Sequence, residues 1–159
     1  MIRAATLMAL TLPALSSGQY YRGVNLAGAE FGENTIPGTI GSTHTYNSER
    51  SFQYFAARSL PLIRLPIRWE RLQPVLRGPL DPVNLAALKR DVAWAKAQGA
   101  RLVVDLQNFG RFSFNEPGGL SAYVLDNFYN GVVRVSGADL ADFWVRLSEE
   151  FKAEPAVHA

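Results

Sequence analysis

The stretch Leu62-Ile63-Arg64-Leu65-Pro66-Ile67-Arg68-Trp69-Glu70 decides the fold. It is an apolar run of strand length that carries an arginine in its middle and is followed at once by a tryptophan and a carboxylate. A short buried strand seldom holds a guanidinium unless a group at its end needs one. We therefore predict the second strand of a βα-repeat protein, with Arg64 pointing into a site at the carboxyl end, where α/β folds bind ligands.

Composition limits the classes of protein to which the chain can belong. Its 159 residues are 48% hydrophobic, which is enough for one compact domain with a core. It has no cysteine, so disulfides and thiolate metal sites are excluded. The net charge of +2 comes without a basic block, which argues against a nucleic-acid partner. His44 and His158 are isolated in sequence, and we expect no metal or organic cofactor.

Residues 1–18 have the order of a secretory signal peptide. Met1-Ile2-Arg3 carries one positive charge, an apolar run from Ala4 to Leu15 follows, and Ser16-Ser17-Gly18 supplies small residues. The run is too short to span a bilayer as a helix, so no membrane span is expected. We predict a secreted protein, extracellular or periplasmic, whose domain begins at residue 19. The alternative is an ordinary buried N-terminal helix.

The remaining sequence alternates between short apolar runs and segments of helical periodicity. We expect strands at 22–26, 60–65 and 102–106, helices beginning near Ser48, at Pro82 and near Leu140, and irregular loops at 33–47, 69–80 and 107–137. Parallel strands joined by helices of this length imply right-handed crossovers.

The middle helix has the clearest boundaries. Asp81 precedes Pro82 and is a good N-cap, while proline is tolerated at the first helical position. Gly99 predicts a left-handed stop. Between them the predicted buried face consists of Leu85, Leu88, Val92 and Ala95.

Three parallel strands leave both edges of the sheet open. Residues 155–159 look like the approach to a fourth strand. The sequence therefore indicates an incomplete sheet. A self-contained three-layer α/β domain is the less favoured alternative, because the chain has no glycine-rich phosphate-binding signature.

Several motifs in order resemble a known family. They are 22–26, then 54–58 leading into 63–74, then Leu80-Asp81-Pro82, then 103–112, and the helix that begins with 140–144. Together they are similar to the N-terminal part of glycoside hydrolase family 5, the cellulase family, from about Tyr20 to Ala159. The resemblance implies that residues 19–159 are the N-terminal part of a catalytic domain and form a partial TIM (β/α)8 barrel, its first three βα units.

The same resemblance implies an activity. Members of this family mostly cut β-1,4 linkages in cellulose and related glucans with retention, using two glutamates about 5 Å apart. In the family, one glutamate ends the fourth strand after an asparagine, and the other ends the seventh strand. Neither position falls within this chain. The resemblance thus implies an endo-β-1,4-glucanase-like enzyme acting on β-glucan, with this chain inactive alone. A non-catalytic sugar-binding or self-associating fragment is the alternative.

The resemblance also assigns site residues. Arg64 matches an arginine that holds the nucleophile ionised and oriented through charge-assisted hydrogen bonds. Gln107 stands where relatives usually have histidine, and it can bond a sugar hydroxyl although it does not titrate near neutral pH. Gln107 and Asn108 are expected to orient the substrate, and Trp69 is expected to stack against a sugar ring.

Three further carboxylates, Glu30, Glu70 and Glu116, lie near predicted strand ends or within a motif similar to that of the family. Glu30 and Glu70 follow strand ends, where they could meet sugar hydroxyls, although a solvated surface glutamate is the commoner case. Asn115-Glu116-Pro117 is similar to the acid/base motif of the family. It follows the third strand without an intervening helix, so we interpret it as a loop turn and not as a catalytic site.

Overall fold

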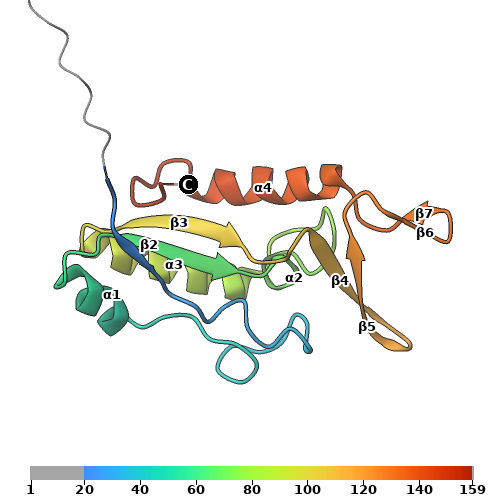
Figure 1. Ribbon diagram of the computed structural model, residues 1–159, viewed down its shortest axis with the longest axis horizontal. Coiled ribbons are helices and arrows are strands. Elements are labelled where there is room, and N and C mark those ends of the chain that lie inside the picture. Colours follow the sequence, from blue (N-terminus) through green and yellow to red (C-terminus); the bar gives the residue numbers. More distant parts are fainter. Residues whose placement is uncertain (1–19, 159) are drawn as a thin grey trace, which may run out of the picture.

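The computed structural model describes residues 20–158, and its centre is a small parallel sheet (Figure 1). The sheet has the order β1 (Gly23–Asn25), β2 (Leu62–Ile67), β3 (Arg101–Leu106). All pairings are parallel, as the sequence predicted. The predicted signal peptide lies outside the described residues. Within them, no helix is long and apolar enough to cross a membrane.

The helices alternate with the strands as predicted. They are α1 (Glu49–Ala56), the single turn α2 (Trp69–Leu72), α3 (Pro82–Ala97) and α4 (Gly137–Phe151). Figure 1 shows α3 running along one face of the sheet, with α4 lengthwise beside β3. The turn α2 corrects our expectation of an irregular loop over 69–80.

One face of the sheet supplies the core. Because side chains alternate along a strand, Ile63, Leu65 and Ile67 share one face, and each is at most 1% exposed. The same buried cluster includes Leu88 of α3 and Phe143 of α4. Arg64 and its neighbours in register lie on the opposite face, which leaves that face available for polar chemistry.

Helix α3 confirms its sequence signals. The Asp81 carboxylate accepts a hydrogen bond of 2.8 Å from the Asn84 backbone N–H, and Gly99 has a φ of +64°. The buried face includes Leu88, as predicted, and also buries two polar residues, Asn84 and Asp91. Those two were not foreseen, since helical periodicity identifies only apolar positions.

Strand β2 begins and ends two residues later than predicted and runs through Pro66. The last residue that β1 pairs with is Arg64, whose carbonyl accepts from the Leu26 N–H at 3.0 Å. Residues 62 and 64 bond toward β1, so the missing N–H of Pro66 faces the side where β1 has already ended. The proline therefore removes no bond from the sheet.

The prediction of an irregular loop over 107–137 is wrong for most of this segment. It forms two antiparallel ribbons, β4 (Arg111–Glu116) with β5 (Gly119–Val124) and β6 (Phe128–Tyr129) with β7 (Val132–Val133). The signal for the second ribbon was Asn130-Gly131, whose φ angles of 52° and 79° suit a two-residue hairpin turn. Figure 1 shows both ribbons at the carboxyl end of the sheet.

The last described residues begin to extend the sheet. The Leu102 N–H donates to the Ala156 carbonyl and the His158 N–H donates to the Leu102 carbonyl, both at 2.7 Å. Val157 forms a parallel bridge with Leu102. The predicted approach to a fourth strand is therefore present.

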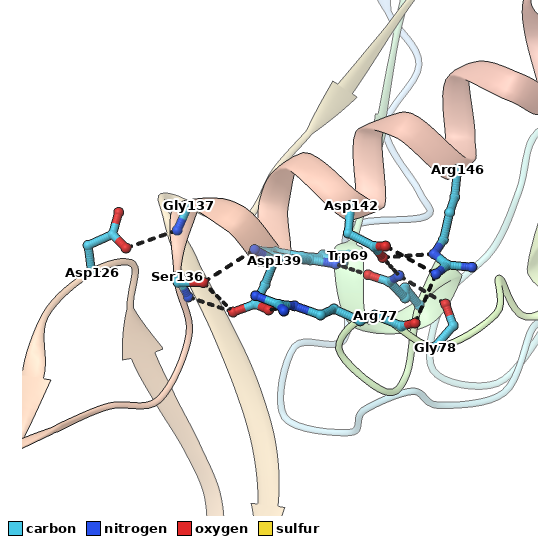
Figure 2. A network of polar contacts seen from close by, with 10 residues as sticks. Trp69, Arg77, Gly78, Asp126, Ser136, Gly137, Asp139, Asp142 and Arg146 are labelled. Carbon is cyan, nitrogen blue, oxygen red and sulfur yellow. Dashed lines mark hydrogen bonds and ion pairs between the residues drawn. The ribbon is translucent and has the colours of Figure 1, made fainter.

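A polar network fixes the start of α4 (Figure 2). Ser136 and Asp139 form a capping box, and the Gly137 N–H donates to Asp126 at 2.9 Å. Gln73, from the segment after α2, donates to the Asp142 carboxylate at 2.8 Å. Arg146 pairs with Asp142 at 2.7 Å. These bonds hold α4 against the loop that joins α2 to α3.

The long segment between β1 and α1 is held by one buried arginine. Arg71 is 1% exposed, and its guanidinium donates to four backbone carbonyls of that segment. The acceptors are Ala29, Phe31, Gly32 and Pro37. Burial, the largest cause, and the nearby Arg68 charge lower the pKa of Arg71 to about 10, so it stays charged at neutral pH.

The far end of the same segment is fixed by a buried histidine. His44 Nε2 lies 3.0 Å from the Asn84 carboxamide oxygen, so Nε2 carries the proton. The Tyr46 hydroxyl donates to that oxygen at 3.2 Å. Burial lowers the pKa of His44, so the ring is neutral near pH 7.

Replacing Arg71 tests whether the guanidinium holds the loop. Because several carbonyls would lose their donor inside the protein, we expect Arg71→Met to lower the free energy of unfolding by about 3 kcal/mol. Urea unfolding followed by circular dichroism measures this. The control is Arg58→Met, since Arg58 is exposed and donates to the Tyr54 carbonyl at 3.0 Å. If both variants lose the same free energy of unfolding, Arg71 does not hold the loop.

Replacing His44 tests whether this histidine makes the stability of the protein depend on pH. The folded-state pKa lies below the ordinary value of 6.5, so protonation favours the unfolded chain. The stability that neutral His44 contributes is therefore present above about pH 6.5 and lost as the pH falls below it. We expect His44→Gln to remove this part of the slope in thermal unfolding between pH 8 and pH 5. Parallel slopes for the two proteins would refute it.

Candidate functional site

Arg64 joins the ends of all three strands of the sheet. Its guanidinium donates to Asn25 of β1 at 2.5 Å, to Asp105 of β3 at 2.6 Å and to the Gln107 carboxamide oxygen. Parallel pairing places Asn25 opposite Arg64, so these side chains share one face of the sheet. The guanidinium is thereby fixed near the carboxyl end of the sheet, although Arg64 itself lies in the middle of β2.

Asp105 is a carboxylate partner that the sequence reasoning did not assign to Arg64. Both side chains are partly exposed, at 39% for Arg64 and 38% for Asp105. The Arg64 side chain therefore stays partly accessible to solvent. Gln107 meets the arginine with a neutral oxygen acceptor, which a carboxamide provides at any pH.

A cavity of about 330 Å³ opens beside Arg64, and we name it the Arg64 cavity. Its lining includes Asn25, Glu30, Phe31, Arg64 and Gln107. Phe31 is 60% exposed, which gives the cavity an apolar ring next to several hydrogen-bonding groups. That combination is typical of sites that bind sugars, whose rings have apolar faces and polar edges.

A second cavity of about 340 Å³ lies toward the β4–β5 ribbon, and we name it the hairpin cavity. Its lining includes Asn34, Arg111, Leu120 and Ala122. The two cavities share three lining residues, Glu33, Arg68 and Phe109.

Glu30 lines the Arg64 cavity but is only 9% exposed. One of its carboxylate oxygens accepts from the Gly28 N–H at 2.7 Å. Its backbone carbonyl accepts from Arg68 at 3.1 Å, and Arg68 also pairs with Glu33 at 3.2 Å. The structure thus places Glu30 at the site, where its carboxylate also stabilises the loop.

Asn108 and Glu70 form a buried joint in the wall of the hairpin cavity. Asn108 is 5% exposed and Glu70 1%. The Asn108 amide donates to Glu70 at 2.7 Å and to the Arg111 carbonyl at 3.2 Å, while its oxygen accepts from the Trp69 N–H at 2.8 Å. The Ser113 N–H also donates to Glu70 at 2.7 Å. Both amide hydrogens of Asn108 are used, so none is left for a sugar, against our expectation.

Trp69 also departs from its expected role. The indole is fully buried, packed edge-to-face on Phe112 with ring centroids 5.0 Å apart and tilted against Phe143 at 5.7 Å. Its N–H donates to Gln73 at 2.9 Å, within the network of Figure 2. A sugar ring cannot reach either face of the indole. The exposed aromatic residues that line the two cavities are Phe31 and Phe109, at 60% and 75%.

Glu116 ends β4, and Pro117-Gly118 makes the turn to β5. The carboxylate accepts from the Tyr123 hydroxyl at 2.9 and 3.0 Å and pairs with Arg134 at 2.8 Å. The Tyr123 hydrogen bond is the largest cause lowering the pKa of Glu116. An ionised glutamate at the tip of a hairpin fits the structural interpretation of this motif.

Sequence reasoning missed Asn25, Asp105 and Phe31 as site residues. The signal available for Asn25 and Asp105 was their place near the ends of two predicted strands, which meet at one edge of a parallel sheet. Phe31 carried no such signal. Among residues 20–158, no group of three or more histidine, aspartate or glutamate side chains could hold a metal ion.

Truncating Asn108 tests the joint. Asn108→Ala leaves the buried Glu70 carboxylate and the Trp69 N–H short of a partner, so we expect the free energy of unfolding to fall by about 2–4 kcal/mol. Thermal unfolding measures the loss. Asn127→Ala is the control, because Asn127 is exposed and should change stability by about 0.5 kcal/mol or less. If Asn108→Ala leaves the free energy of unfolding nearly unchanged, the hydrogen bonds of Asn108 do not stabilise the fold.

Comparison with known proteins agrees with this architecture. The model of the family described as Cellulase (glycosyl hydrolase family 5) matches residues 23–159. Endo-beta-1,4-glucanase B of Emericella nidulans is 32% identical over 150 residues, which cover 94% of this chain and 40% of that protein.

Solved structures agree as well. A triple mutant of an endo-beta-1,4-glucanase from Xanthomonas axonopodis pv. citri superimposes with a TM-score of 0.75 at 40% identity, over 87% of this chain and 40% of that one. XacCel5A in complex with cellopentaose gives a TM-score of 0.73 at 39% identity, over 86% and 40%. The chain thus spans about 40% of the length of these proteins. It belongs to the cellulase family, glycosyl hydrolase family 5, and forms the first three βα units of a (β/α)8 barrel.

Proposed function

We propose that this chain is the arginine-bearing part of a retaining endo-β-1,4-glucanase-like hydrolase that acts on β-glucan. The observation that carries the proposal is the set of three hydrogen bonds that holds the guanidinium of the partly exposed Arg64 near the carboxyl ends of three parallel strands. Such a guanidinium can orient a carboxylate nucleophile and keep it ionised. Relatives described as endo-β-1,4-glucanases support the substrate class.

The chain supplies positioning and binding groups in this proposal. Arg64 would face the nucleophile, and Gln107, Glu30 and Phe31 would line the place of the sugar. The family resemblance puts the two reacting glutamates at the ends of the fourth and seventh strands. Of the barrel strands, the described residues contain β1 to β3 and the first bridge of the next parallel strand, between Leu102 and Val157. We therefore propose that the chain alone does not hydrolyse glucan. From the order of charged, apolar and small residues at the N-terminus, we also propose that residues 1–18 direct secretion.

The inactivity is tested with purified chain and carboxymethylcellulose. We expect no release of reducing ends, because retaining hydrolysis needs two carboxyl groups about 5 Å apart and the proposal places neither in this chain. Glu116→Gln is assayed in parallel. Turnover by the native chain would refute the proposal, and its loss in Glu116→Gln would make Glu116 the acid/base.

The binding part is tested by calorimetric titration with cellotriose, with maltotriose as the α-linked comparison. We expect cellotriose to bind preferentially. Phe31→Ala should weaken it about two- to tenfold, the contribution typical of one aromatic contact. Phe128→Ala is the matched control, since Phe128 is 70% exposed and lines neither cavity. Absence of any cellotriose binding would exclude a sugar site in this part of the enzyme.

A further inference from the structure

The Arg64 cavity does not end at the strand ends. It meets the hairpin cavity at Phe109 and at the Arg68–Glu33 pair, which line both. The hairpin cavity is floored by the ribbon β4–β5, which the family resemblance gave no reason to expect as part of a site. A linear ligand that fills the Arg64 cavity can therefore continue across Phe109 onto the ribbon.

Phe109 is placed for contact with a ligand. Its ring is 75% exposed, and its backbone has a φ of 52°, which is uncommon for a bulky residue. The preceding Asn108 is locked by its three hydrogen bonds and fixes the chain at that point. The fold thus holds an apolar ring in solvent at the junction of the two cavities.

The charges around the hairpin cavity favour a neutral ligand. Arg68 and Arg111 contribute positive charge, and Glu33 and Glu70 contribute negative charge. Arg68 is already paired with Glu33 at 3.2 Å, and Glu70 accepts two hydrogen bonds from the protein. A balanced set of charges offers hydrogen-bonding groups without the one-signed field that would attract an ion. Asn34 adds a carboxamide with both donors and an acceptor.

We propose that the hairpin cavity binds the continuation of the β-glucan chain whose nearer sugar units occupy the Arg64 cavity. This inference rests on the proposed function and extends it by assigning a further binding region, made by Phe109, Asn34, Arg111 and the ribbon. Phe109 would provide the stacking surface at the junction. The ribbon would make affinity depend on the length of the glucan.

The test compares cellotriose with cellohexaose by calorimetric titration of the full chain. We expect cellohexaose to bind about tenfold more tightly than cellotriose. Ala122→Lys fills the hairpin cavity from an exposed position of β5 that does not line the Arg64 cavity. It should abolish the gain for cellohexaose and leave cellotriose binding unchanged. Ala141→Lys, at an exposed position of α4, is its control.

Phe109→Ala provides a second variant, with Phe128→Ala as its matched control. We expect Phe109→Ala to weaken cellohexaose about two- to tenfold. If native chain binds both oligosaccharides equally, or if Ala122→Lys and Phe109→Ala both keep the native difference, the inference fails while the proposed function stands. If neither oligosaccharide binds, the sugar-binding part of the proposed function fails and the inference falls with it.

Discussion

The arrangement of the site depends on how one buried charge is solvated. Arg71 lies inside the protein and forms no ion pair with a carboxylate among residues 20–158, and backbone carbonyls of the segment between β1 and α1 surround its guanidinium. Burying a charge is costly unless dipoles replace its water, and buried carbonyls need donors. The carbonyl dipoles replace the water around the guanidinium, and the guanidinium supplies the donors that the buried carbonyls need. The segment that carries Glu30 and Phe31 is consequently fixed at the carboxyl end of the sheet.

Three arginines of one stretch have three different tasks. Arg64 points to the open face, where it joins three strands and stays partly exposed. Arg68 connects the loop after β1 to the junction of the two cavities. Arg71, one helical turn further, is wholly enclosed. The change from strand to the single turn α2 after Arg68 directs these side chains into different environments, although they are only a few residues apart.

Local rules were sufficient for the regular elements. The cap at Asp81, the left-handed Gly99 and the apolar periodicity of α3 and α4 predicted helices that the structure confirms, because each of these signals acts within one turn. The ribbons between β3 and α4 were not predicted. Strands β6 and β7 have only two residues each, so local periodicity could not reveal them. Signals were present all the same, because Phe112 and Phe114 alternate with polar residues along β4 and Asn130-Gly131 was an adequate hairpin signal.

The sequence by itself determined the order of the three parallel strands and of helices α1, α3 and α4, the apolar positions on the buried face of α3 and the arginine within β2, since these depend on local periodicity and on the parallel sheet. Only the tertiary structure decided which polar side chains face the cavities. Trp69 and Asn108 follow strand ends as Phe31 and Gln107 do, yet the former pair is enclosed by Phe112, Phe143 and Glu70. Exposure of a loop side chain depends on segments far away in sequence that pack over it. Local patterns carry no information about that packing.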